Sequence, residues 1–404
     1  MPHPPATRRI HPPTARRLRI ALVASYDVTD VHSWSGIAFY VLQTLKRCGF
    51  DVLTIGALED IFSLSCRLKF YQRKLRRVRY IHWLEPEILR GYGQQIAERI
   101  RDKDIDVVVS LGSAPISYLE ISQPIVFLSD ATFAALKNFY PDFTGLSPET
   151  LRNGDDMEQR ALSRCAKAIF TSDWAAQSAL KDYAADPQKV EVIPFGANIE
   201  SSRTRAEIVT ILQQKSFDIC KLLFVGVDWK RKGGDRALEV ATMLNRRGLP
   251  TELHIVGCEP PSPTPDFVVR HGFVSKKSPE GAALFDRLLM DSHFLVVPSL
   301  AECYGLVFAE ASSFGLPSFA TRVGGIPTVV VDGVNGYTLD LAAPASDYCD
   351  LIENLFRDRD AYDRMALACF REYTGRLNWH VAGERIQATI KSVCAEAAAP
   401  VNRK

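Results

Sequence analysis

The sequence predicts an α/β protein made of two Rossmann-like, doubly wound parallel-sheet domains that face a cleft. Two observations predict this fold class. The chain has 404 residues, which is enough for two domains at about 150 residues each. Short apolar runs typical of buried strands alternate with segments of helical periodicity, and this series starts again after residue 200.

The first series opens with a strand at residues 18–25, an apolar run typical of a strand buried on both faces of a parallel sheet. A polar loop then leads to Gly36, a helix at 37–48 and a strand at 51–55. This order is the βαβ unit of a doubly wound sheet. Further strands are expected at 106–111, 124–128, 168–171 and 190–194, with helices at 91–103 and 155–166.

A second series follows a polar stretch at residues 199–215. Its expected elements are strands at 221–225, 252–256, 293–298 and 318–321, a helix at 236–246, and a final amphipathic helix at 378–397. We expect a disordered leader (1–17), an N-terminal domain (18–198), a C-terminal domain (199–377) and a C-terminal helix (378–404) that packs back toward the first domain. The alternative is one long sheet with an insertion.

The charge balance excludes some classes of protein. With 49 Lys+Arg against 47 Asp+Glu the net charge is +2, which argues against a generic nucleic-acid binder. Residues 1–100 hold 16 basic and 8 acidic residues, so this part carries +8 and the remainder −6. The basic part alone indicates an anionic partner.

The cysteines and the hydropathy pattern bear on the compartment. Nine scattered cysteines form no CxxC pair, which argues against a disulfide framework or a zinc site and favours a reducing compartment. The Pro- and Arg-rich leader lacks the apolar core of a signal peptide, and no apolar run reaches the roughly 18 residues that span a bilayer. We expect a cytoplasmic protein, at most peripheral on the inner face of the membrane.

The most informative segment runs from a strand end into a helix at residues 298–321. Gly305 lets an anion approach the backbone there, and the free N–H groups of Leu306 and Val307 in the first helical turn favour a phosphate. Glu302 precedes the helix, and Glu310 lies roughly 7 to 8 Å inside it at 1.5 Å rise per residue. Two carboxylates flanking a phosphate site suit the hydroxyls of two sugars. The alternative is a pair of ordinary carboxylates stabilised by the helix dipole.

Two other strand ends carry candidate site residues. Arg231 and Lys232 lie between a strand end and the Gly233-Gly234 turn, where they suit phosphate oxygens; the alternative is a solvated charge run. Asp130 follows the strand at 124–128. It is expected either to bond a sugar hydroxyl or help activate an acceptor, or to cap the next helix.

Several motifs together resemble a known family. The run from Glu302 to Glu310 resembles the E-x7-E element of family 4 retaining glycosyltransferases, which have the GT-B fold. The resemblance extends to FVGVDWKRKGG at 224–234, GG at 324–325, DGVNG at 332–336, VIPFGAN at 192–198 and SDW at 172–174. The cationic turn is similar to the lipopolysaccharide core glucosyltransferase branch.

The resemblance implies roles for the donor-side residues. Glu310 matches the glutamate that bonds the nucleotide ribose, and Glu302 the one that holds donor-sugar hydroxyls beside the reacting carbon. Arg231 and Lys232 match the basic pair on the diphosphate. The chain departs from many members at Val227, where they carry an arginine after the strand-end glycine.

The resemblance also implies roles for two loops. Gly36 resembles the glycine of a loop that closes over the phosphates, with Ser35 assisting it. Phe273 and Val274 resemble the segment that holds the base through its backbone. Many members place a histidine near the donor sugar where this chain has Asp130 in the segment 129–132.

A basic segment from Arg67 to Arg79 holds seven cations in thirteen residues, interleaved with apolar and aromatic side chains. Such a segment can lie on an anionic membrane surface, and enzymes of the family use their first domain in this way. The alternative is a solvated helix face. An RNA site is disfavoured because the rest of the chain offers no basic groove or stacking platform.

The resemblance implies a metal-independent hexosyltransferase that moves a sugar, with retention, from a nucleotide diphosphate sugar to a glycan or lipid-linked hydroxyl. UDP is favoured over GDP, and the pathway expected is surface polysaccharide or lipopolysaccharide synthesis. No HExxH, GxGxxG or P-loop is present, so neither a metal nor another cofactor is expected. The alternatives are a nucleotide-sugar epimerase, a phosphorylase, or a non-catalytic nucleotide-sugar-binding module.

Overall fold

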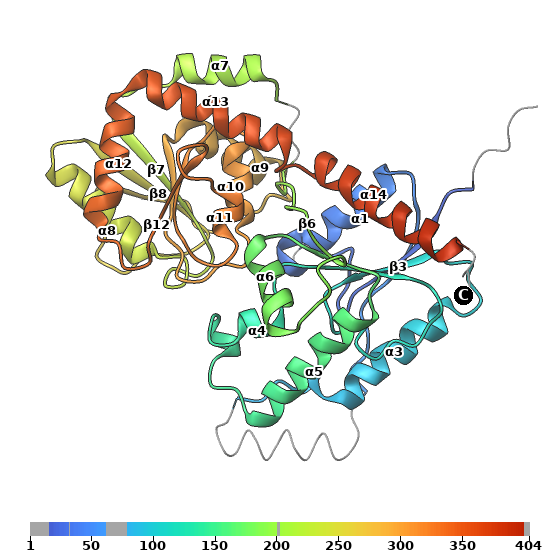
Figure 1. Cartoon of the computed structure of the whole chain (residues 1–404). Coiled ribbons are helices and arrows are strands. Elements are labelled where there is room, and N and C mark those ends of the chain that lie inside the picture. Colours follow the sequence, from blue (N-terminus) through green and yellow to red (C-terminus); the bar gives the residue numbers. More distant parts are fainter. Residues whose placement is uncertain (1–15, 32, 62–78, 200–202, 400–404) are drawn as a thin grey trace, which may run out of the picture.

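A computed structural model of the chain describes residues 16–31, 33–61, 79–199 and 203–399. It has two lobes, each built on its own six-stranded parallel sheet (Figure 1). The α/β fold with two parallel-sheet domains is therefore confirmed, and the alternative of one long sheet with an insertion is wrong.

The first sheet has the strand order β2-β1-β3-β4-β5-β6, and every neighbouring pair is parallel. Its central strands are apolar and fully buried because helices cover both faces of the sheet. The strands are β1 (Arg19–Val23), β2 (Asp51–Ile55), β3 (Val107–Leu111), β4 (Ile125–Ser129), β5 (Lys167–Phe170) and β6 (Val190–Val192).

The second sheet has the order β12-β11-β10-β7-β8-β9 and is also parallel throughout. Two short strands, β9 and β12, extend its edges beyond the four strands expected from the sequence. The strands are β7 (Cys220–Val225), β8 (Thr251–Val256), β9 (Val268–Arg270), β10 (Phe294–Val297), β11 (Ser318–Thr321) and β12 (Gly336–Leu339).

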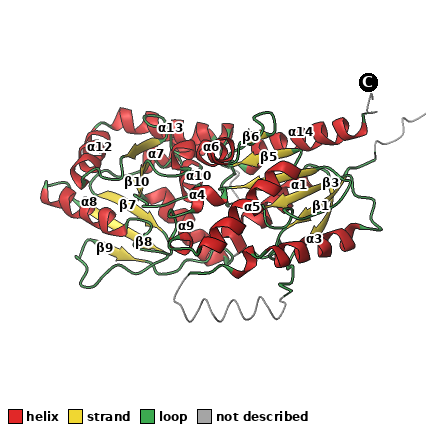
Figure 2. Cartoon of the chain, turned by 60° about the horizontal axis from the view of Figure 1, so that its bottom comes forward, coloured by secondary structure: helices red, strands yellow, loops and turns green. Residues whose placement is uncertain are grey.

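Helices flank the strands of both sheets (Figure 2). Those of the first domain are α1 (Ile37–Arg47), α3 (Pro86–Ile100), α4 (Phe133–Leu136), α5 (Pro148–Arg164) and α6 (Asp173–Asp182), with 3₁₀ turns η1 (Ser33–Gly36), η2 (His82–Leu84) and η3 (Pro141–Phe143). Those after it are α7 (Arg205–Gln214), α8 (Gly234–Arg246), α9 (Pro279–Asp291), α10 (Leu306–Ser312), α11 (Ile326–Val329), α12 (Ala345–Arg357), α13 (Arg359–Gly375) and α14 (Trp379–Ala398).

Three helix starts differ from the sequence expectation for a local reason. Helices α3 and α5 begin earlier than the predicted 91 and 155, because Pro86 and Pro148 stand in their first turns. The polar stretch at 199–215, where no element was predicted, contains α7. A capping box between Thr204 and Glu207 starts that helix.

Helix α14 leaves the second domain and packs against α1 of the first domain (Figure 1). The Gln387 amide donates a hydrogen bond to the Cys48 carbonyl at 2.6 Å, and the Thr389 hydroxyl donates one to Glu191 at 2.7 Å. The interdomain segment runs beside the start of this helix, where Phe195 stacks on Trp379. The last helix therefore fixes the chain across the junction of the two domains.

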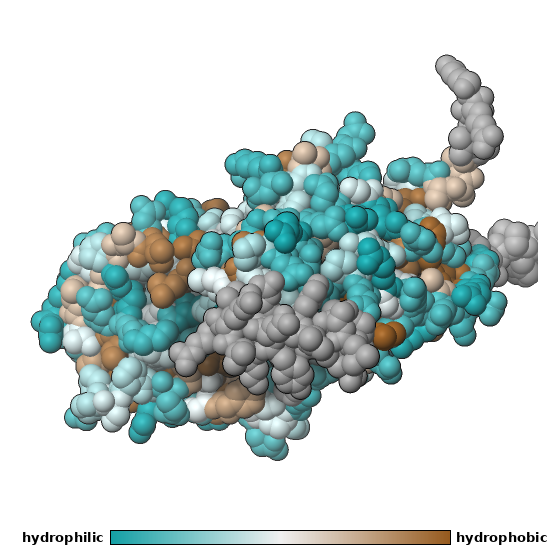
Figure 3. Space-filling view, turned by 90° about the horizontal axis from the view of Figure 1, so that it is seen from below, coloured by the Kyte–Doolittle hydropathy of each residue, from teal (hydrophilic) through white to brown (hydrophobic). Residues whose placement is uncertain are grey.

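The face drawn in Figure 3 is mainly hydrophilic, with apolar residues in small groups. None of the helices in the described ranges has the length and apolar character needed to cross a membrane. Most of the predicted leader and residues 67–78 of the basic segment lie outside the described residues. Arg16 is placed and pairs with Asp104 and Asp106, and Arg79 donates a hydrogen bond to the Pro141 carbonyl.

Candidate active site

Each sheet reverses its strand order at one point. In the first sheet β1 has its successor β2 on one side and β3 on the other, and in the second sheet β7 lies between β8 and β10. At such a reversal the loops after adjacent strands diverge and leave a crevice at the carboxyl edge, which is where ligands bind in open α/β sheets. The candidate residues of the second domain follow β7 and β10, at this reversal.

The turn after β10 exposes a helix start. Gly305 is the N-cap of α10 with φ +90°, and a Cβ there would stand 2.6 Å from the Phe308 ring, so the turn requires glycine. Within the described part of the chain, the amides of Leu306 and Val307 donate no hydrogen bond. The helix start therefore offers N–H groups and a positive dipole end to an anion.

Glu302 lies in this turn and is 9% exposed. Its carboxylate forms an ion pair with the Lys232 ammonium group, and an Arg231 nitrogen lies 3.6 Å from the same oxygen. Arg231 also donates a hydrogen bond to the Ala301 carbonyl at 3.1 Å. The loops after β7 and β10 thus bring two cations onto one carboxylate, which satisfies a charge that would be costly to bury alone.

The charge run after β7 is not solvated as a whole. The Lys230 side chain is 76% exposed and pairs with Asp235, whereas the side chains of Arg231 and Lys232 are 19% and 13% exposed. Lys232 passes over Gly226, where a Cβ would stand 2.7 Å from its Cγ. The interpretation as a solvated charge run therefore holds for Lys230 only.

Glu310 is buried inside α10, and its carboxylate pairs with Lys276 at 2.5 Å. Lys276 belongs to the segment after β9 that also contains Phe273, which is exposed, and Val274, which is half-buried. The structure thus brings the end of this predicted base-binding segment to α10.

Asp130 follows β4 on the first domain and accepts a hydrogen bond from the Trp34 indole at 3.0 Å. Burial raises the pKa of Asp130 to about 6; the Trp34 hydrogen bond opposes this shift and the Glu302 charge adds to it. Because the Glu302 charge contributes to this shift, Asp130 of the first domain lies within electrostatic range of the second domain's site. The helix-cap reading is wrong, because Thr132 caps α4 by accepting from the Ala135 amide.

The loop with Ser35 and Gly36 is attached to the domain junction. Asn198 donates from its side-chain amide to the Ser35 carbonyl at 2.8 Å and accepts from the Trp379 indole at 2.9 Å. Trp34 and Ser35 have positive φ angles of 47° and 54°, a conformation uncommon for side chains larger than glycine. One asparagine therefore holds the loop, the interdomain segment and the start of α14 together.

Tyr140 is a site residue that the sequence did not indicate. Its hydroxyl accepts a hydrogen bond from the Cys303 amide at 3.1 Å, and its ring lies under the Arg231 guanidinium at 5.3 Å. Burial, then the neighbouring Cys303 and Glu302, raises the pKa of Tyr140. Trp34 and Tyr140 lie in no motif recognised in the sequence, whereas Asn198 ends the VIPFGAN run at 192–198. Lys276, the partner of Glu310, lies two residues after Val274 of the predicted base-binding segment, and this proximity was the usable signal for it.

The site's cations come from lysine and arginine. No group of three or more His, Cys, Asp or Glu side chains with metal-binding geometry occurs in the ranges for which coordinates are described.

The second domain matches a family model. Residues 220–358 match the family described as glycosyl transferases group 1. D-inositol 3-phosphate glycosyltransferase of Paenarthrobacter aurescens is 28% identical over 239 residues, which cover 56% of this chain and 57% of that protein. The chain thus spans a little over half the length of this relative.

Solved structures share the whole fold. WaaG, a glycosyltransferase involved in lipopolysaccharide biosynthesis, superposes with a TM-score of 0.62 at 15% identity, covering 92% of this chain and 99% of that one. Anabaena HepE, solved with UDP and glucose, gives 0.61 at 16% identity, covering 93% and 100%. Fold and crevice define the class, a two-domain GT-B protein. Together with the match of residues 220–358 to glycosyl transferases group 1, these findings agree with the resemblance to family 4 glycosyltransferases.

Proposed function

We propose that the chain transfers a sugar from a nucleoside diphosphate donor, UDP in preference to GDP, to a hydroxyl of a glycan or lipid-linked acceptor. The observation that carries this proposal is the assembly of Glu302, Lys232 and Arg231 at the free start of α10. It combines positive charge and open amides for a diphosphate with a carboxylate for sugar hydroxyls.

The donor would lie along the carboxyl edge of the second sheet. Its diphosphate is placed at the Leu306 and Val307 amides and the Arg231–Lys232 pair. Its ribose is placed at Glu310, which exchanges Lys276 for ribose hydroxyls. The base lies along the backbone of Phe273 and Val274. Gly36 and Ser35 of the first domain cover the phosphates from the other side.

The chemistry follows from where charge develops. The bond from the sugar's anomeric carbon to the diphosphate oxygen breaks, and the acceptor oxygen bonds to that carbon on the same face. The acceptor proton passes to the leaving diphosphate oxygen, so configuration is retained. Lys232 and Arg231 stabilise the charge that grows on the diphosphate. Glu302 holds the sugar hydroxyls, and Asp130 orients the acceptor hydroxyl.

The acceptor is assigned to the first domain and the nucleotide sugar to the second. Cell-surface polysaccharide or lipopolysaccharide synthesis in the cytoplasm is the setting we propose, supported by the fold shared with WaaG. Contact of the basic segment from Arg67 to Arg79 with an anionic membrane belongs to the same proposal.

The test is incubation with UDP-glucose, UDP-galactose, UDP-N-acetylglucosamine, GDP-mannose and ADP-glucose, with and without sugar acceptors. We expect acceptor-stimulated release of nucleoside diphosphate, and proton NMR of the product showing the donor's anomeric configuration. An epimerase would convert the donor sugar without an acceptor, and a binding module would bind donor without releasing nucleotide. An inverted product would contradict retention.

A further inference from the structure

A cavity of about 710 Å³ opens in the first domain at the reversal of its sheet, where the loops after β1, β3 and β4 meet. Asp130 lies on the wall of this cavity, and its pKa responds to the charge of Glu302 in the site of the second domain. Aromatic rings make up much of the remaining wall: Tyr26, Trp34, Trp83, Tyr92, Phe133 and Phe143. Such rings offer flat apolar faces on which the C–H faces of a sugar ring can pack.

The inner wall carries a carboxyl group with spare hydrogen-bonding capacity. Glu158 of α5 is 2% exposed, and one of its oxygens accepts from the Ser113 hydroxyl at 3.0 Å and the Phe133 amide at 3.2 Å. Its other oxygen has no hydrogen-bond partner among the described residues. A buried polar atom is normally satisfied, and Glu158 is among the residues that line the cavity, so its unpaired oxygen leaves this side chain with capacity to bond a polar ligand there.

The charged residue types on the described wall of the cavity are all acidic. Asp60, Asp130 and Glu158 line it, and no Lys, Arg or His is found on the described part of its wall. His82 contacts Asp60 at 3.0 Å without itself lining the cavity, and Tyr92 donates to the same carboxyl.

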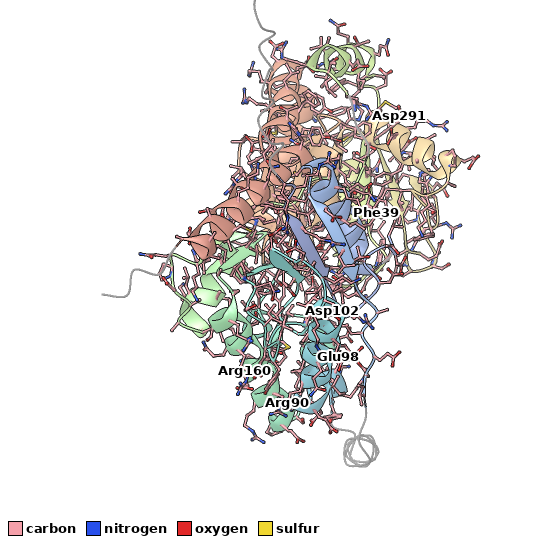
Figure 4. The ribbon with its side chains drawn as sticks, turned by 90° about the vertical axis from the view of Figure 1, so that its right-hand side faces the viewer. Phe39, Arg90, Glu98, Asp102, Arg160 and Asp291 are labelled. Atoms are coloured by element: carbon pink, nitrogen blue, oxygen red, sulfur yellow. The ribbon has the colours of Figure 1, made fainter. Side chains whose placement is uncertain are left out.

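Nearby cations of this domain are engaged elsewhere. Arg90 on α3 and Arg160 on α5, both labelled in the same part of Figure 4, place their guanidinium groups on the Tyr118 ring at 4.7 Å and 4.5 Å. Lys137 pairs with Asp155 at 3.0 Å. An anionic ligand in this cavity would therefore meet three carboxyl groups and no described cation on its wall.

We infer that this cavity takes the acceptor as an uncharged sugar ring, and that it excludes a ring bearing phosphate or carboxylate. This inference rests on the proposed function, since it assigns a chemical class to the acceptor. It separates the chain from its relatives named D-inositol 3-phosphate glycosyltransferase, a name that contains a phosphorylated ring. The aromatic walls hold the ring, and the free oxygen of Glu158 bonds one of its hydroxyls.

Burial raises the pKa of Glu158 to about 7, so the group is ionised at mildly alkaline pH. Near neutrality it can also donate to a hydroxyl in its protonated form. Either form of Glu158 can bond a hydroxyl of a neutral ring. A phosphate dianion is repelled by the ionised form, and it would also lose its water shell on entering the cavity.

The test compares, at pH 8, matched pairs of compounds that differ by one phosphate. The pairs are glucose and glucose 6-phosphate, N-acetylglucosamine and N-acetylglucosamine 6-phosphate, and myo-inositol and inositol 3-phosphate. Binding to the full chain is followed without donor by intrinsic tryptophan fluorescence, to which the wall residues Trp34 and Trp83 contribute. We expect at least one neutral member to bind, about tenfold or more tightly than its phosphate. Equal or tighter binding of the phosphates, or no response to any neutral ring, would overturn the inference.

A variant tests whether the wall charge is the cause. Glu158→Gln removes one negative charge and should reduce the discrimination between pair members at least about threefold, with Glu120→Gln on the exposed surface of the same domain as control. Unchanged discrimination in a folded Glu158→Gln protein would count against the inference. If that variant does not fold, the binding of the neutral and phosphorylated compounds to the wild-type protein still tests the inference. Because binding is measured without donor, a failure of sugar transfer would appear separately in the release of nucleotide.

Discussion

The Tyr140 hydroxyl accepts a hydrogen bond from the Cys303 amide at 3.1 Å and thereby joins the first domain to the turn that carries Glu302. The tyrosine ring also lies against the Arg231 guanidinium. One first-domain side chain therefore contacts both loops that form the proposed diphosphate site, so its removal should affect transfer more than folding.

Tyr140→Phe should lower transfer about threefold to tenfold. The variant leaves the Cys303 amide without its partner, and a lost hydrogen bond of this kind costs about 0.5–1.5 kcal/mol. Steady-state kinetics with UDP-sugar give the rate, and thermal unfolding should show a small change. Tyr118→Phe, which removes a hydroxyl bonded to Asp156 outside the cleft, is the matched control. Equal rates for the two variants would contradict a role for Tyr140 in the site.

Glu302→Gln and Lys232→Met should each lower kcat by about 10²–10³, because each removes a charged group acting where charge develops. Combining the two should add little further loss, since the residues form one ion pair. Circular dichroism verifies folding, and Glu259→Gln, an exposed substitution in the same domain, serves as control. Turnover within twofold of wild type in either single variant would remove that residue from the mechanism.

Glu310→Gln should weaken nucleotide binding about tenfold, the effect of one charged hydrogen bond to a ribose hydroxyl. Lys276→Met should not weaken it, because in this account the ribose takes the place of Lys276 on the carboxylate. Isothermal titration calorimetry with UDP measures both. A loss in Lys276→Met as large as that in Glu310→Gln would indicate that the ion pair itself binds the nucleotide.

Glu158→Gln should change the pH dependence of stability. The pKa of Glu158 is raised from 4.5 to about 7 by burial, so the folded state binds this proton more tightly than the unfolded chain. The resulting stability is fully present below about pH 4.5 and is lost as the pH rises through about 7. Glutamine does not titrate, so the variant should gain up to about 3 kcal/mol relative to wild type between pH 4 and pH 8.

Urea unfolding at these two pH values measures this difference. Glu120→Gln provides the reference for an exposed carboxyl, and a stability difference for Glu158→Gln that is the same at both pH values would show that Glu158 is not buried as described.

The sequence was sufficient for the architecture because each parallel strand is a short apolar run that can be recognised locally. It was also sufficient for the order of Glu302, Gly305 and Glu310 along one turn and helix. Helix starts were less predictable, since Pro86 and Pro148 allow a helix to begin before its apolar periodicity becomes visible.

The partners of the site could not be predicted, for a different reason. Trp34 meets Asp130 across 96 residues, and Tyr140 meets Cys303 across 163. The first contact depends on how the loops of one domain fold together, and the second on how the two domains are placed relative to each other. No spacing along the chain encodes either. The orphan oxygen of Glu158 likewise becomes visible only when the cavity wall is assembled.

The central claim is that a nucleoside diphosphate binds at the start of α10, between Glu302 and Glu310. Amide hydrogen exchange of the full chain, with and without saturating UDP, GDP or ADP, tests it most directly. The account predicts added protection in peptides covering residues 300–310 and 228–234 for whichever nucleotide binds. Binding that protects other segments while leaving these two unchanged would contradict it.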